Sequence, residues 1–134
     1  MTDKIGLDTN VALRWLVQDP SNLDQSLRAM SAIDAFDGPI HINLVVLAEL
    51  VWLVSRTLKA GRAEQALLIR GLLEHPFVEL ADKAAVATAL TLFEQGGAGF
   101  TDHLIAALNG GAGCATTLTF DKVAARGNDF TLLD

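Results

Sequence analysis

Apolar residues along this chain follow two spacings, one typical of strands and one typical of helices. Longer segments with an apolar side chain at every third or fourth position separate shorter apolar segments. Strands that alternate with helices favour a parallel sheet, because each connecting helix must return across the sheet. The predicted strands lie at residues 4–8, 40–42, 77–80 and 115–119, with a short fifth at 130–133.

Residues that cap or stop helices divide the remaining segments. Asp8 to Asn10 and Asp82 suit helix starts, Thr101 is expected to cap the last helix, and Gly61 is expected to end the third. We therefore predict an α/β fold with three layers, α/β/α, around a central, mainly parallel sheet of four to five strands. The predicted helices begin near residue 11, cover 24–36, 44–60 and 62–74, run from 83 to about 95, and cover 102–108.

Glu49 is the one charged residue in the apolar segment 44–54. A helix that is apolar on nearly all sides is expected to be buried, and burial would carry the Glu49 carboxylate into the interior. An ionised carboxylate is retained there only beside a cation, a set of hydrogen-bond donors or a shared proton. Glu49 therefore predicts a bound partner group of one of these kinds.

Three further acids lie at the ends of predicted elements. Asp8 and Asp121 follow the first and fourth strands, and Asp102 lies at the start of a buried helix. Each alone is explained by structure: Asp8 as a helix cap, Asp102 by the helix dipole, Asp121 as a turn residue. Ligands of open parallel sheets bind beyond the carboxyl ends of the strands, so we expect all three to meet Glu49 at one rim.

Clustered carboxylates restrict what this rim can hold. Two carboxylates about 5 Å apart repel by roughly 3 kcal/mol at an effective dielectric constant near 20. Some of the acids are then protonated, or a cation lies between them. Oxygen ligands without cysteine or a set of histidines select a hard ion such as Mg²⁺ or Mn²⁺. Such an ion can bind a phosphate oxygen and activate a water molecule for hydrolysis.

Composition sets the broad class of the protein. A length of 134 residues suits one domain, here 1–134, and 51% hydrophobic residues with 19% charged residues leave apolar surface for a second copy or a partner. The net charge of −6 argues against nucleic-acid binding unless metal ions reverse the local potential. No segment suits a membrane span or a signal peptide, so we expect a cytoplasmic protein. Cys114 is expected to be a buried thiol.

Four segments, taken in order, resemble the acidic motifs of PIN-domain ribonucleases, and most closely those of the VapC-type toxins of toxin–antitoxin modules. The resemblance covers nearly the whole chain. At one position it departs from the pattern: many relatives carry an acid three residues before the third-motif Asp, where this chain has Gly99. The matching segments are Ile5-Gly6-Leu7-Asp8-Thr9-Asn10, Leu47-Ala48-Glu49-Leu50, residues 100–107 around Asp102, and Thr119-Phe120-Asp121.

The resemblance implies a Mg²⁺- or Mn²⁺-dependent endoribonuclease toxin that a cognate antitoxin neutralises, and a homodimer. It implies that Asp8, Glu49, Asp102 and Asp121 bind or orient the metal, with Thr9 and Asn10 supporting the first motif. Hydrolysis by a metal-activated water would leave 5′-phosphate and 3′-hydroxyl ends.

Two other classes of function remain open from the sequence. A metal-dependent DNA nuclease or phosphatase would use the same acids. A receiver or scaffold domain would bind one ion without catalysis. Candidates for binding the substrate backbone are the cations Arg14, Arg56, Lys59, Arg62, Lys122 and Arg126.

Overall fold

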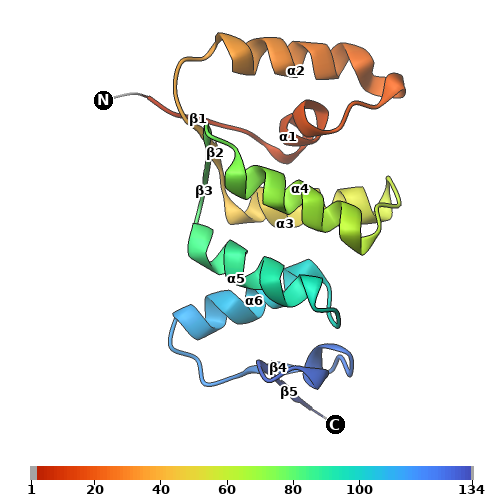
Figure 1. The fold of residues 1–134 in the computed structure, drawn as a ribbon, viewed down its shortest axis with the longest axis vertical. Coiled ribbons are helices and arrows are strands. Elements are labelled where there is room, and N and C mark those ends of the chain that lie inside the picture. The colour runs from red at the N-terminus through yellow and green to blue at the C-terminus, as the bar shows by residue number, and fades with distance from the viewer. Residues whose placement is uncertain (1–2, 134) are drawn as a thin grey trace. The chain divides into compact units, whose positions relative to one another are not determined.

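A computed structural model describes residues 3–133, which contain six α-helices, two 3-10 helices and five short strands (Figure 1). Contacts within the chain divide it into two compact units. Unit 1 consists of Met1–Lys59 and Glu74–Ala81, and unit 2 consists of Ala60–Leu73 and Asp82–Asp134. The assignment of the chain to one domain stays a prediction.

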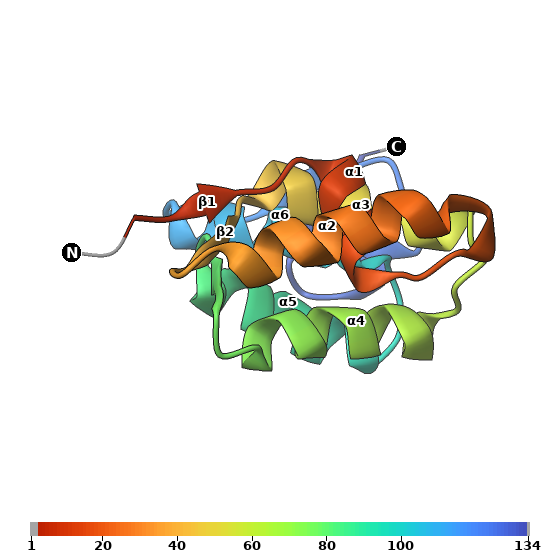
Figure 2. The same cartoon turned by 90° about the horizontal axis from the view of Figure 1, so that it is seen from above.

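Unit 1 contains a parallel sheet in the order β1-β2-β3. Ile5 pairs with Ile40, and Ile40 pairs in turn with Val78, so the three strands start at a common level. Figure 2 shows α2 lying across α1, with which it is in contact. The elements of unit 1 are β1 (Ile5–Gly6), α1 (Thr9–Leu16), η1 (Pro20–Asn22), α2 (Leu23–Ala35), β2 (Ile40–Ile42), α3 (Leu44–Arg56) and β3 (Val78–Leu80).

Unit 2 is built on two contacting helices, α5 and α6. Phe93 of α5 and Phe100 of α6 are almost fully buried and meet edge to face, with ring centroids 6.1 Å apart. The parallel strands β4 and β5 form a separate two-stranded sheet in which Leu118 pairs with Thr131. The elements of unit 2 are α4 (Arg62–Glu74, all but its last residue), α5 (Lys83–Glu94), α6 (Phe100–Gly111), β4 (Thr117–Thr119), η2 (Ala124–Arg126) and β5 (Phe130–Leu132).

The predicted class, α/β with parallel strands and helices between them, is confirmed. The strands pair in two groups, one in each unit. Several predicted helix ends are wrong, most clearly those of α3 and α6. The helix around Glu49 ends at Arg56 instead of at Gly61, and α6 begins at Phe100 after Gly99, with no cap from Thr101. Among residues 3–133, no helix combines the length and the apolar character needed to cross a bilayer.

The predicted burial of Glu49 is also wrong. Helix α3 buries Leu47, Leu50 and Val54, whereas Glu49 lies on the opposite, exposed face. The sequence does not identify this face as exposed, because it also carries apolar side chains. One of them is Trp52, which exposes 57% of its surface. Cys114, expected to be buried, is exposed as well, because it lies in the connection between α6 and β4.

Candidate functional site

Asp8 follows β1 and caps helix α1. Its backbone is extended, with φ −81° and ψ 172°, and its Oδ1 accepts a hydrogen bond of 2.9 Å from the N–H of Val11. A carboxylate at a helix start also benefits from the positive end of the helix dipole. Since one oxygen of Asp8 holds the helix, the other oxygen is the atom through which this side chain can bind a ligand.

Thr9 connects the first motif to the second. Its hydroxyl donates a hydrogen bond of 2.7 Å to Oε1 of Glu49, an exposed carboxylate in the second turn of α3. Helix α3 is itself capped by Asn43, whose Oδ1 accepts from the N–H of Val46 at 2.9 Å. Unit 1 therefore places Asp8 and Glu49 beyond the carboxyl ends of β1 and β2, as the sequence predicted for these two acids.

Asn10 lies beside a hollow that neither Asp8 nor Glu49 lines. It lines a hollow of about 320 Å³ between α1 and α2, together with Arg14 and Arg28. Arg14 donates a hydrogen bond of 2.7 Å to the side chain of Gln25, which fixes its guanidinium group beside this hollow. The structure thus associates Asn10 with two cations rather than with the carboxylates of Asp8 and Glu49.

Asp102 and Gly99 lie together at the start of α6, in unit 2. Asp102 is half-buried in the first turn, and Gly99 occupies the capping position without a side chain to accept a hydrogen bond. A Cβ atom built on Gly99 would lie 3.8 Å from Oδ2 of Asp102, an ordinary van der Waals distance. The backbone here, with φ −69° and ψ 164°, would accept a residue with a side chain.

Asp121 holds the segment that follows β4. Its Oδ1 accepts hydrogen bonds from the N–H groups of Val123 at 2.8 Å and Ala124 at 3.3 Å, at the start of η2. Asp121 is exposed. These bonds agree with the alternative explanation of Asp121 as a turn residue, and Oδ2 is the oxygen that this role leaves for a ligand. Its predicted role at a metal ion stays a prediction.

The third and fourth motifs adjoin one cavity in unit 2. His103, next to Asp102, lines this cavity of about 540 Å³ with Val123, Ala124 and Arg126. Both ring nitrogens of His103 are buried and have no hydrogen-bond partner among residues 3–133. His103 was not among the candidate site residues of the sequence analysis.

The donor atoms of these residues suit a divalent metal ion. They are carboxylate oxygens, which Mg²⁺ and Mn²⁺ prefer, and Mg²⁺ in proteins often takes one or two carboxylates and keeps several waters. Unit 1 offers such a pair in Asp8 and Glu49. In the part of the chain that is described, no three Asp, Glu, His or Cys side chains are grouped closely enough to hold a metal.

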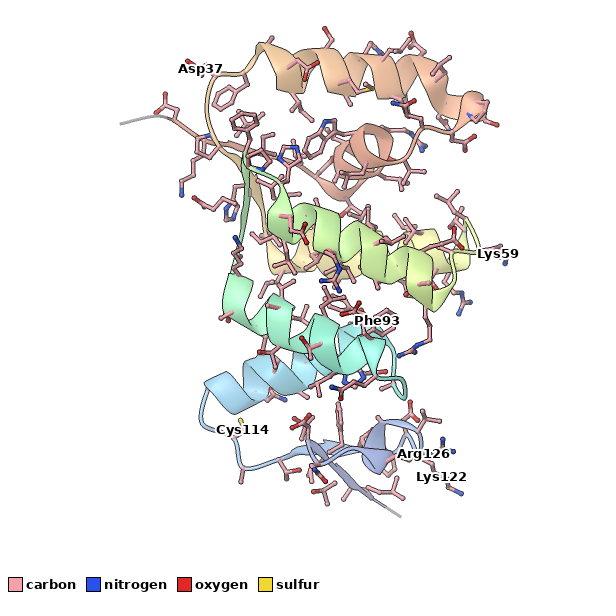
Figure 3. The ribbon with its side chains drawn as sticks, in the orientation of Figure 1. Asp37, Lys59, Phe93, Cys114, Lys122 and Arg126 are labelled. Carbon is pink, nitrogen blue, oxygen red and sulfur yellow. The ribbon has the colours of Figure 1, made fainter. Side chains whose placement is uncertain are left out.

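Two of the cations proposed for substrate binding have structural roles. Arg62 donates hydrogen bonds to the carbonyl oxygens of Phe93 at 2.7 Å and Gly97 at 3.2 Å, and lies 4.1 Å from the Phe93 ring centroid. Arg56 lies 5.6 Å from the ring centroid of Trp52. Lys122, directly after Asp121, and Arg126, the last residue of η2, are both exposed (Figure 3). These two remain the candidates closest in sequence to a predicted acid.

Comparison with known proteins assigns a family to this arrangement. The family model of the PIN domain matches residues 5–128 and therefore includes all four candidate acids. No curated protein sequence gives a significant match to the chain.

Proposed function

Because the chain belongs to the PIN domain family, whose members are generally metal-dependent nucleases, we propose that it is an endoribonuclease toxin. It would hydrolyse RNA with Mg²⁺ or Mn²⁺ and be held inactive by a cognate antitoxin protein. We further propose that it acts in the cytoplasm as a homodimer.

The contact between Thr9 and Glu49 is the observation that best supports a nuclease site. A threonine hydroxyl in a helix commonly bonds to a carbonyl of its own helix, as Thr91 does to Ala87. Thr9, which directly follows Asp8 in the chain, instead donates to an exposed carboxylate of another helix. An exposed carboxylate fixed in this way contributes little to stability and is better explained by ligand binding.

Each residue then has a part in the proposed chemistry. Asp8 and Asp102 would bind the ion most directly, while Glu49 and Asp121 would complete its ligands or position water. Thr9 orients Glu49. Asn10, through its side-chain amide, and Arg14 would contact the RNA backbone. A bound Mg²⁺ or Mn²⁺ supplies Lewis acidity and lowers the pKa of a coordinated water.

Hydrolysis is tested with the purified full-length protein on structured RNA, single-stranded DNA and a small phosphomonoester. We expect cleavage of RNA only, in Mg²⁺ or Mn²⁺ and not in EDTA, with 5′-phosphate and 3′-hydroxyl ends. Cyclic phosphate ends would contradict the metal-dependent mechanism. Preferential cleavage of DNA or of the monoester would assign the protein to another branch of metal-dependent hydrolases.

Variants separate this activity from a contaminating nuclease. Asp8→Asn keeps a side chain that caps a helix and should abolish cleavage. Asp82→Asn makes the same change at the cap of α5 and should leave cleavage intact. Full activity of Asp8→Asn would rule out the proposed site. The toxin assignment is tested apart from this, by asking whether co-expression of the small adjacent gene relieves growth arrest.

A further inference from the structure

Unit 1 has a hollow at the end of its sheet opposite to Asp8 and Glu49. The segments that enter β2 and β3 bound it, whereas Asp8 and α3 follow the strands. Its volume is about 480 Å³. We call it the amino-end hollow; it is lined by Trp15, Ile33, Asp34, Phe36, Asp37, Gly38, Ile40, His75, Pro76 and Phe77.

Aromatic rings form much of the wall. His75 lies between Trp15 and Phe77, with ring centroids 5.3 Å and 6.0 Å away and both contacts edge to face. Nδ1 of His75 accepts a hydrogen bond of 3.1 Å from the N–H of Phe77, which fixes the orientation of this ring. Phe77 nevertheless exposes 65% of its surface. The three rings therefore contact one another within the unit, and Phe77 leaves one side of the group exposed to solvent.

The charges around the hollow have a single sign. Asp34, in the last turn of α2, and Asp37, on the segment that joins α2 to β2, both line it and are exposed. Figure 3 labels Asp37 on that segment. No lysine or arginine is among the lining residues. Aromatic faces attract cations through their quadrupole, and carboxylates beside them add charge attraction. The hollow is thus complementary to a cationic group that also has an apolar stem.

We propose that the amino-end hollow binds an arginine side chain of a protein partner. A guanidinium group stacks on aromatic rings and pairs with carboxylates, and its methylene stem suits Ile33 and Pro76 at the wall. The exposed rim favours a side chain presented by a protein over a free small cation, because small-molecule sites enclose most of their ligand. This inference does not depend on the proposed nuclease activity.

Fluorescence of the full-length protein tests the proposal directly. The chain has two tryptophans and no tyrosine, so Trp52→Phe makes Trp15 the only strong emitter. The probes are a short peptide with one arginine, the same peptide with neutral citrulline in its place, and choline. We expect the arginine peptide to change Trp15 emission, with citrulline and choline at least about tenfold weaker and affinity falling as salt is raised.

Variants assign the binding to the hollow. Asp37→Asn and Phe77→Leu should each weaken arginine binding about three- to tenfold. Asp24→Asn makes the same charge change at the exposed start of α2, outside the hollow, and should leave binding unchanged. Circular dichroism checks that each variant is folded.

Three outcomes would overturn the proposal. These are no change in Trp15 emission up to about 10 mM arginine peptide, a weak-binding limit, equal binding of citrulline, and equal binding of choline. The last would assign the hollow to a small quaternary ammonium ligand instead of a protein partner. Cleavage of RNA can succeed or fail independently of all three.

Discussion

The hydroxyl of Thr9 donates a 2.7 Å hydrogen bond to the carboxylate of Glu49. Thr9 is the first residue of α1, after β1, and Glu49 lies in α3, after β2. The parallel strands β1 and β2 are neighbours in the sheet, and each is followed by a helix. The hydrogen bond from Thr9 to Glu49 joins the first turn of α1 to the second turn of α3. Because the contact is exposed, we expect it to matter more for the orientation of Glu49 than for stability.

Thr9→Val should lower the rate of RNA cleavage by about tenfold or more, because a carboxylate that is free to rotate spends less time in a productive position. Thr9→Ser keeps the hydroxyl and should restore most of the rate. Steady-state kinetics at saturating metal would measure both. Equal rates for the valine and serine variants would show that the hydrogen bond has no part in catalysis.

Asp8 should prove to have two separable roles. Asp8→Asn should leave the free energy of unfolding nearly unchanged, because Asn caps helices as well as Asp does, while cleavage is lost. Asp8→Ala should lose cleavage and also about 1 kcal/mol of stability. Asp82→Ala removes the corresponding cap of α5 and should cost more, because Asp82 has φ +47° and Ala is strained there, while cleavage continues. Urea unfolding combined with cleavage assays distinguishes the two roles.

Gly99→Asp should tighten metal binding, because it adds a carboxylate next to Asp102 at a position whose backbone accepts a side chain. Gly99→Asn is the matched control: it gives α6 the same capping group without charge, worth only a few tenths of a kcal/mol over Gly. Calorimetric titration with Mn²⁺ would compare them. Equal Mn²⁺ affinity of the Gly99→Asp and Gly99→Asn variants would mean that the added carboxylate does not contact the metal ion.

Arg62→Met should destabilise the protein by about 1–2 kcal/mol, because it removes the contacts of the guanidinium group with the Phe93 ring and two carbonyl groups. Its RNA affinity should stay close to that of the wild type. Arg126→Gln should do the reverse, weakening RNA binding and reducing its dependence on salt with little loss of stability. Filter binding at two salt concentrations and urea unfolding would decide between these roles.

Stability should also depend on Glu79 at acid pH. The hydrogen bond from Lys4, 2.8 Å long, and then the contact with His41 at 2.9 Å hold the pKa of the Glu79 carboxyl below its usual value. The stabilisation is therefore present above the unfolded pKa, about 4.3, and is lost as pH falls through the lower, folded pKa. Urea unfolding across this range should show a weaker pH dependence in Glu79→Gln than in the wild type, whereas Glu74→Gln should change it little.

The spacing of apolar residues was enough to predict most elements. The strand Ile40–Ile42 and the helix Arg62–Glu74 were predicted to the residue, because Gly, Pro and a change of apolar period mark their ends. The caps Asp8 and Asp82 were predicted because short polar side chains at helix starts act locally. The start of α6 was not predicted, because Gly99 at the capping position has no side chain that could mark it. Thr101, a residue type common at caps, lies inside the helix instead.

Sequence alone determined the class of fold, the order of the four acidic motifs and hence the family. These depend on local propensities and on residue types at set intervals, which are present before any tertiary contact forms. Only the tertiary structure decided that Glu49 is exposed and hydrogen-bonded to Thr9, that Asn10 lies with arginines, and that the His103 nitrogens are buried without partners. These features depend on which face of each helix is covered by residues distant in sequence. Helix α3 has apolar side chains on both faces, so its sequence does not show which face is buried.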